Sequence, residues 1–236
     1  MSSRPDPGPD AMTFVLVPGA GGDGYYWHLL APLLGADTVS VDLPAGDEHA
    51  GLAAYADAIV AAADGATDVV LVAQSLGGFS APLAADRLDA RRIVLLNAMV
   101  PKPGETFNEW WGAVGQQEAF REYAERDGRD PDAGWDEGEL FFHDVPPEVT
   151  EAVYARGEPQ QADKPCGEPW PLPAWPDVPT SAITGRHDRL FPEPLQRAYL
   201  RDRLGIEPTV IDGGHLVALS NPKGLADVLL GDTDQG

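Results

Sequence analysis

Short apolar runs alternate with longer helical patterns along most of the chain, and this alternation constrains the fold more than any other feature of the sequence. Each run is rich in Val, Ile or Leu and too short for a helix, which is typical of strands buried on both faces. The runs cover residues 13–17, 38–43, 68–73, 92–97, 180–184 and 209–212, and helical patterns lie between them over 52–63, 76–87, 192–204 and 222–230. This order predicts an α/β fold, in which a mostly parallel sheet of about six strands carries helices on both faces.

The alternation stops in the middle of the chain, where no strand pattern is visible and Pro, Glu, Asp and Trp become frequent. Helical patterns are expected over 107–126 and 148–154, whereas 157–179 contains too many prolines for regular structure. We therefore predict one α/β core, formed by residues 12–100 and 179–236, and a helical cap insertion formed by residues 101–178.

The charge balance excludes two classes of partner. The 236 residues include 38 Asp and Glu but only 16 Lys and Arg, which gives a formal net charge of −22. Such a chain has no basic surface that would release counterions from nucleic acid, and it is repelled by anionic membranes. We therefore expect neither nucleic acid nor a membrane as a partner.

The first residues and the cysteine content bear on location. Residues 1–11 are polar, contain three prolines and lack an apolar run, so we predict a disordered leader and neither a signal peptide nor a membrane span. Cys166 is the only cysteine, which excludes an intramolecular disulfide and gives no sign of an oxidising compartment. A cytoplasmic location is expected by default, and the sequence leaves open whether Met12 is the natural start.

The segment from Val70 to Gly78, VLVAQSLGG, is the strongest local signal for chemistry. A buried strand pattern runs directly into Ser75 and then into a helical pattern. On such a tight turn a serine hydroxyl stands above the edge of the sheet, where it acts as a nucleophile. In the usual pattern, G-x-S-x-G, the first glycine is replaced here by Ala73. An ordinary turn without a catalytic function is the alternative.

A glycine-rich loop, PGAGG at residues 18–22, follows the first apolar run. Together with Ser75 this loop resembles the α/β-hydrolase superfamily, in which a loop at this place supplies one backbone amide to an oxyanion hole. The resemblance assigns this amide to Ala20 and the second amide to Leu76, while Pro18 occupies the superfamily's histidine position. A phosphate-binding loop is a poor alternative, because no Lys-Ser or Lys-Thr follows the glycines. We expect no cofactor, and no spacing typical of metal ligands is visible.

His215 is the best candidate for the general base among the five histidines. It follows a late strand pattern directly, in VIDGGH, where two glycines give the imidazole access to the edge of the sheet. Asp188 lies in the loop after the preceding strand, and with Pro192 it matches the place of the superfamily's acid, which orients the imidazole. The order Ser75, Asp188, His215 is also that of the superfamily. A helix-capping role for Asp188 and a surface role for His215 are the structural alternatives.

Within the superfamily the chain resembles the small cap-bearing esterases that include plant methylesterases and hydroxynitrile lyases, on the evidence of segments 18–22, 30–34 and 41–44. The lyases usually have a lysine directly after the catalytic histidine, and Leu216 in that position argues against lyase activity. The resemblance implies a serine hydrolase that cleaves a small apolar or aromatic carboxylic ester through an acyl-enzyme. Lactonase, thioesterase or carbon–carbon bond hydrolase activity and a non-catalytic ligand-binding function remain open alternatives.

The insertion leaves and rejoins the sheet at the edge where Ser75 is expected, so we predict that it covers the serine. Trp110, Trp111 and Phe141 from the insertion, with Tyr25 beside the glycine-rich loop, are the predicted substrate-binding residues. The alternative is that the tryptophans and phenylalanine fill the insertion's own core. A small-molecule substrate is the expected partner, and the sequence indicates no oligomeric state.

Overall fold

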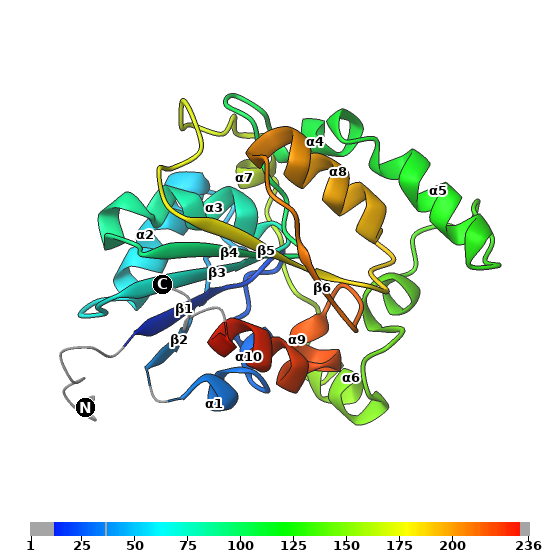
Figure 1. Cartoon of the computed structure of the whole chain (residues 1–236), viewed down its shortest axis with the longest axis horizontal. Helices are drawn as coiled ribbons and strands as arrows, with labels where there is room; N and C mark the ends of the chain where they lie inside the picture. The colour runs from blue at the N-terminus through cyan, green and yellow to red at the C-terminus, as the bar shows by residue number, and fades with distance from the viewer. Residues whose placement is uncertain (1–11, 36, 232–236) are drawn as a thin grey trace.

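The strands pair into one sheet in the order β2-β1-β3-β4-β5-β6 (Figure 1). This computed structural model describes residues 12–35 and 37–231. The strands are β1 (Thr13–Val17), β2 (Thr38–Ser40), β3 (Val69–Gln74), β4 (Arg92–Leu96), β5 (Thr180–Gly185) and β6 (Thr209–Ile211). Every pairing among these strands is parallel, which confirms the predicted α/β fold class. All the strands therefore end at the same edge of the sheet.

Successive residues of the central strands point to opposite faces of the sheet, so the sheet buries two separate apolar layers. Val15 and its register partner Leu71 belong to one layer, and the next residue pair, Leu16 and Val72, belongs to the other. The helices on the first face are α2 (Leu52–Ala62), α3 (Gly77–Ala84) and α8 (Glu193–Leu204), and those on the second are α1 (Ala31–Leu34), α9 (Val217–Ser220) and α10 (Pro222–Gly231) (Figure 1).

Short 3₁₀ helices and one shortened strand mark the connections. The 3₁₀ helices are η1 (Gly24–Trp27) and η2 (Asp86–Leu88). Strand β2 ends at Ser40 and not at residue 43 as predicted, because the chain turns there toward the loop after β1. The Leu43 amide donates to the Gly22 carbonyl at 2.8 Å, which ties this turn to the glycine-rich loop.

Between β4 and β5 the chain leaves the sheet, and residues 101–178, here called the inserted segment, lie beside the carboxyl ends of the strands (Figure 1). The segment contains α4 (Phe107–Ala113), α5 (Gln116–Arg126), a π-helical turn η3 (Gly138–Phe142), α6 (Pro147–Tyr154) and α7 (Lys164–Gly167). The helical pattern expected over 107–126 is divided between two helices, because Gly115 between them adopts a left-handed φ of 71°. The predicted boundaries between core and cap at residues 100 and 179 stay a prediction.

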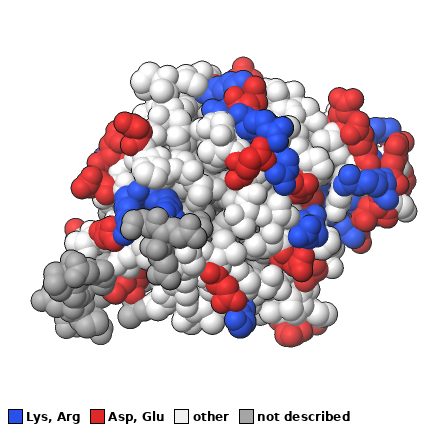
Figure 2. All heavy atoms as spheres, in the orientation of Figure 1, with Lys and Arg blue, Asp and Glu red and all other residues white. Residues whose placement is uncertain are grey.

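Charged side chains of both signs are interspersed on the face seen in Figure 2, most densely toward the end where α5 lies. Arg129, for example, pairs with Asp127 at 2.8 Å. None of the helices in the described part of the chain has the length and the apolar composition needed to cross a membrane. The predicted disordered leader, residues 1–11, lies outside the described residues.

Candidate active site

Ser75 occupies a strained turn between β3 and α3. Its φ of 51° is a left-handed value that residues with a side chain rarely adopt. The Ser75 carbonyl accepts the amides of Gly78 (3.1 Å) and Met99 (3.0 Å), and the Ser75 amide donates to the Leu96 carbonyl (3.3 Å). These bonds hold the turn in the conformation that lifts a serine side chain above the edge of a sheet.

Small residues let strand and helix backbones approach each other around this turn. A Cβ atom at Gly78 would lie 1.8 Å from the Met99 carbonyl oxygen, and one at Gly77 would lie 2.9 Å from the Pro18 carbonyl oxygen. Ala73, which replaces the first glycine of the G-x-S-x-G pattern, is fully buried in β3. Its methyl group therefore fits where the usual pattern has a glycine.

The loop after β1 passes directly beside Ser75. A Cβ atom at Gly19 would lie 2.8 Å from Cβ of Ser75, so a side chain there would push the loop away. Ala20 and Leu76, the predicted oxyanion donors, border the same cavity as Ser75. Within the described residues neither of their amides has a hydrogen-bond acceptor. Two free amides beside a serine hydroxyl are what an oxyanion hole requires, and that role stays a prediction.

His215 and Asp188 form a buried hydrogen-bonded pair. Nδ1 of His215 lies 2.8 Å from Oδ2 of Asp188, and their side chains are 1% and 0% exposed. The other carboxylate oxygen accepts the amides of Leu190 (2.9 Å) and Phe191 (2.8 Å). Because Nδ1 faces a carboxylate, the imidazole proton belongs on Nδ1, which leaves the lone pair on Nε2. In the described part of the chain Nε2 has no hydrogen-bond partner, and the ring borders the same cavity as Ser75.

A cavity of about 500 Å³ opens over Ser75 and His215. This volume lies in the range of small-molecule sites, about 300–1,000 Å³. The aromatic residues that line it are Tyr25, Tyr26, Phe107, Trp111, Trp135, Phe141 and Phe142. Phe141 also packs edge-on against the imidazole of His215, with ring centroids 5.3 Å apart. Three of the four predicted substrate-binding residues, Tyr25, Trp111 and Phe141, therefore lie in the cavity wall, and their contact with substrate stays a prediction.

Trp110, the fourth predicted substrate-binding residue, does not border the cavity. Its side chain is fully buried, its ring packs against Phe191 (5.1 Å between centroids) and Tyr199 (5.3 Å), and its indole N–H donates to the Val100 carbonyl (3.1 Å). Consecutive residues of a helix point about 100° apart, so α4 turns Trp111 toward the cavity and Trp110 into the core. The structure therefore places Trp110 in the core and not in the cavity wall where the sequence predicted it.

Tyr26, the neighbour of Tyr25, also lines the cavity. Its hydroxyl accepts the amide of Ala218 at 3.4 Å, in the helix that follows His215. Burial raises the pKa of Tyr26 well above its usual range, and the nearby carboxylates of Asp188 and Asp144 act in the same direction, against the hydrogen bond from Ala218. Tyr26 therefore presents a neutral phenol to the cavity.

The mouth of the cavity carries net negative charge. Arg156 is the only Lys or Arg in the described lining, and its guanidinium pairs with Asp23 (3.1 Å) above the ring of Tyr25 (4.2 Å to the centroid). Glu137 and Glu158 also line the cavity, and neither has an ion-pair partner among the described residues. No group of three or more His, Cys, Asp or Glu side chains in that part of the chain is placed to hold a metal ion.

Two buried side-chain amides behind the histidine–aspartate pair were not singled out from the sequence. Asn97 directly follows β4, and Gln196 lies on α8; they are 0% and 1% exposed. Asn97 bonds to the loop that carries His215, and Gln196 bonds to Asp188 itself. The one available signal was the position of Asn97 at the end of a predicted strand, on the edge where Ser75 was expected.

Several solved structures have a fold similar to that of this chain, although no curated protein sequence matches it. Similar solved structures include polyneuridine aldehyde esterase, with a TM-score of 0.75, 20% identity, and coverage of 94% of this chain and 99% of that one. A pyrethroid hydrolase from Sphingobium faniae has a TM-score of 0.69 and 21% identity, with coverage of 95% of this chain and 98% of that one. The methylesterase MES16 from Arabidopsis has a TM-score of 0.71 and 20% identity, with coverage of 95% of this chain and 99% of that one. At these identities the similarity establishes the fold.

The family assignment comes from the sequence itself. A family profile described as "Alpha/beta hydrolase family" matches residues 14–228, a stretch that includes Ser75, Asp188 and His215. It covers all of the sheet except Thr13 at the start of β1, together with the inserted segment. The chain belongs to the alpha/beta hydrolase family.

Proposed function

We propose that the chain is a carboxylic ester hydrolase that forms an acyl-enzyme on Ser75. The observation that carries the proposal is the buried pair of His215 and Asp188, whose imidazole offers a free Nε2 to the cavity that Ser75 borders. A nucleophile, a base and an acid that orients the base are the parts of a hydrolytic triad.

In the first half of the reaction, Nε2 of His215 removes the hydroxyl proton of Ser75 as Oγ attacks the ester carbonyl carbon. The amides of Ala20 and Leu76 donate to the developing oxyanion, and loss of one such donor in other enzymes lowers kcat about 10²–10³-fold. The tetrahedral intermediate then collapses: its carbon–oxygen bond to the leaving group breaks, and His215 returns the proton to the departing alcohol.

In the second half, His215 removes a proton from a water molecule, which attacks the acyl carbon. The intermediate collapses with release of the carboxylic acid, and the proton returns to Ser75. Asp188 stabilises the imidazolium that forms in each half. His215 has to be neutral before each attack, so that Nε2 can accept a proton.

A small apolar or aromatic ester suits this cavity best. Its volume of about 500 Å³ and its wall of aromatic rings favour a compact hydrophobic acyl group. Glu137 and Glu158 at the mouth disfavour an acyl group that carries its own carboxylate. Two esterases and a pyrethroid hydrolase among the similar structures support a hydrolytic reaction.

The test compares the chain with Ser75→Ala on a p-nitrophenyl series of acetate, butyrate, octanoate and benzoate. The unaltered chain should hydrolyse the short and aromatic esters and should be labelled by a fluorophosphonate at Ser75, as located by mass spectrometry. Ser75→Ala should lose both activities.

Ser80→Ala is a matched control, because Ser80 is a buried serine five residues away whose hydroxyl bonds to the Gly77 carbonyl (3.3 Å). It should keep both activities. Full hydrolysis by Ser75→Ala would exclude the acyl-enzyme, and a chain that binds esters without hydrolysis or labelling would be a ligand-binding protein on this fold.

A further inference from the structure

A cluster of neutral polar side chains lies behind the histidine–aspartate pair, on the side away from the cavity. Asn97 directly follows β4, Thr184 lies in β5 and Gln196 lies in α8, and each is at most 1% exposed. None of them borders the cavity, so none touches a substrate there. Burial of three polar side chains is costly unless each is hydrogen-bonded, and every one of them is.

Gln196 is bonded to the acid of the pair. Its Nε2 donates to Oδ2 of Asp188 at 3.1 Å, the same oxygen that faces Nδ1 of His215. The same amide group lies 2.8 Å from the Phe191 carbonyl and 3.1 Å from Oδ1 of Asn97, so its two protons are shared among three acceptors. On the other end, Oε1 accepts the hydroxyl of Thr184 at 3.1 Å. The Asp188 carboxylate and the Phe191 carbonyl can only accept, so they fix which end of the amide faces the carboxylate.

Asn97 is bonded to the base of the pair through its backbone. Its Nδ2 donates to the carbonyls of Gly214 (3.0 Å) and His215 (3.1 Å), and its Oδ1 accepts the amide of Gly185 at the end of β5 (2.7 Å). A left-handed φ of 44° at Asn97 directs the side chain to these loops. One amide group thus spans the loop that carries the acid and the loop that carries the base.

We propose that Gln196 and Asn97 are positioning residues for the Asp188–His215 pair, an inference that rests on the proposed hydrolytic function of this site. Gln196 fixes the carboxylate in the plane that receives Nδ1–H, and Asn97 fixes the backbone from which the imidazole extends. Their neutrality matters, because within the described residues His215 is the only ion-pair partner of Asp188. An amide satisfies the carboxylate oxygen without cancelling the charge that stabilises the imidazolium.

The test is Gln196→Met, which keeps the size of the side chain and removes the donor. Misplacement of a catalytic group by about 1 Å costs up to about 100-fold in rate. We expect kcat on p-nitrophenyl acetate to fall about 10- to 100-fold with KM changed less than about twofold, because no substrate contact is lost. In ¹H NMR spectra the deshielded Nδ1 proton of His215 should shift or broaden, because its acceptor is no longer held.

Tyr199→Phe is the matched control. Tyr199 lies on the same helix, is 4% exposed and donates one buried hydrogen bond to the Ala98 carbonyl (2.9 Å), so this variant loses a comparable bond away from the pair. It should lose stability but keep kcat and the NMR signal. Thr184→Val provides a milder variant if Gln196→Met does not fold, because it removes the hydrogen bond that holds Oε1 of the Gln196 amide. Its kcat should fall several-fold.

The outcomes separate the positioning role from the proposed function. A folded Gln196→Met protein with kcat within twofold and an unchanged Nδ1 signal would overturn the inference, as would equal losses of kcat in Tyr199→Phe. If the unaltered chain neither hydrolyses esters nor reacts with fluorophosphonate, the proposed function fails. The NMR comparison still decides in that case whether Gln196 positions the pair, since it needs no turnover.

Discussion

Replacement of Asp188 by asparagine tests the geometry of the site most directly. Oδ1 of Asp188 accepts two backbone amides, those of Leu190 and Phe191, so the oxygen of an asparagine has to take this place. Its NH₂ group then faces Nδ1 of His215, where the carboxylate oxygen was 2.8 Å away. Two donors cannot face each other, and the imidazole therefore moves its proton to Nε2. A protonated Nε2 cannot remove the proton of Ser75.

The expected loss follows from this tautomer change. In serine proteases the same substitution lowers kcat about 10⁴-fold, which corresponds to about 5.4 kcal/mol at 1.36 kcal/mol per tenfold. We expect a loss of this order for Asp188→Asn on p-nitrophenyl acetate, with KM little changed. The fold should persist, because the asparagine keeps the size of the side chain and the two backbone amide bonds.

Asp212→Asn is the matched control, because this aspartate lies close to His215 in sequence but is exposed and pairs with Arg186 at 3.1 Å. Exposed pairs contribute about 0–1 kcal/mol, and this variant should keep kcat within twofold. Circular dichroism confirms that both variants are folded. The reasoning is refuted if Asp188→Asn retains more than a tenth of kcat, since Nε2 would then still accept a proton.

Three further predictions concern packing, substrate binding and pH. Gly78→Ala should lower the free energy of unfolding by about 1–3 kcal/mol or more, because its Cβ would meet the Met99 carbonyl oxygen at 1.8 Å. Gly112→Ala, in open space on α4, should leave the melting temperature unchanged or raise it, and equal melting temperatures of the two variants would contradict the close approach at Gly78. Trp111→Ala should raise KM several-fold with a small loss of stability. Trp110→Ala should lower the free energy of thermal unfolding by about 3–5 kcal/mol, with KM of the remaining folded enzyme little changed. The reverse result would mean that the two rings are misassigned. Burial lowers the pKa of His143 below 6.5, against the opposing effect of Asp144. The unfolded chain therefore binds the proton more readily, and the free energy of unfolding should fall as the pH decreases below 6.5. His143→Phe should reduce this pH dependence of the melting temperature, and an unchanged dependence would assign it to other groups.

The sequence was informative where a simple rule of topology applies. Parallel strands end at one edge of the sheet, so the loops that follow β3, β5 and β6 all lie along that edge. Ser75, Asp188 and His215 all occupy such positions, and the structure brings their loops to one cavity. The fold class followed from the same alternation of strands and helices, without any knowledge of side-chain contacts.

The sequence was less informative where helix phase or distant contacts decide the outcome. Trp110 and Trp111 are identical neighbours, and only the rotation of α4 about its axis sends one to the core and the other to the cavity. Gln196 and Asn97 are 99 positions apart, and nothing local in either segment indicates that their amides meet. The break at Gly115 is similar, because a single glycine in a helical pattern costs only about 1 kcal/mol and is often tolerated.

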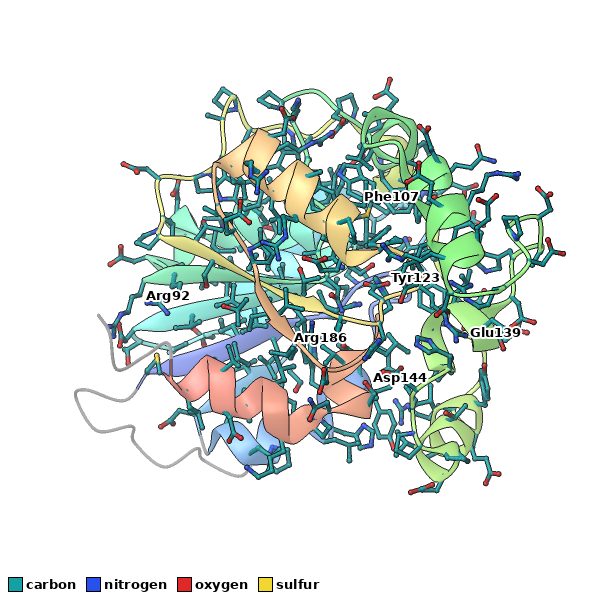
Figure 3. The ribbon with its side chains drawn as sticks, turned by 45° about the vertical axis from the view of Figure 1, so that its right-hand side comes forward. Arg92, Phe107, Tyr123, Glu139, Asp144 and Arg186 are labelled. Atoms are coloured by element: carbon teal, nitrogen blue, oxygen red, sulfur yellow. The ribbon has the colours of Figure 1, made fainter. Side chains whose placement is uncertain are left out.

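The inserted segment contributes more to the site than a cavity wall. It is hydrogen-bonded to three loops at the site. Gln161 accepts the amide of Gly21 (3.0 Å), Gln116 donates to the carbonyl of Leu190 in the loop of Asp188 (2.8 Å), and Asp144 accepts the amide of Gly214 beside His215 (2.5 Å). Figure 3 shows Asp144 beside the loop that follows β6. Two of these loops, those of Asp188 and His215, are also held from the sheet side, by Gln196 and Asn97. A change in the inserted segment therefore has two physical routes to the reaction, through the aromatic wall that meets the substrate and through the hydrogen bonds that hold the loops in register.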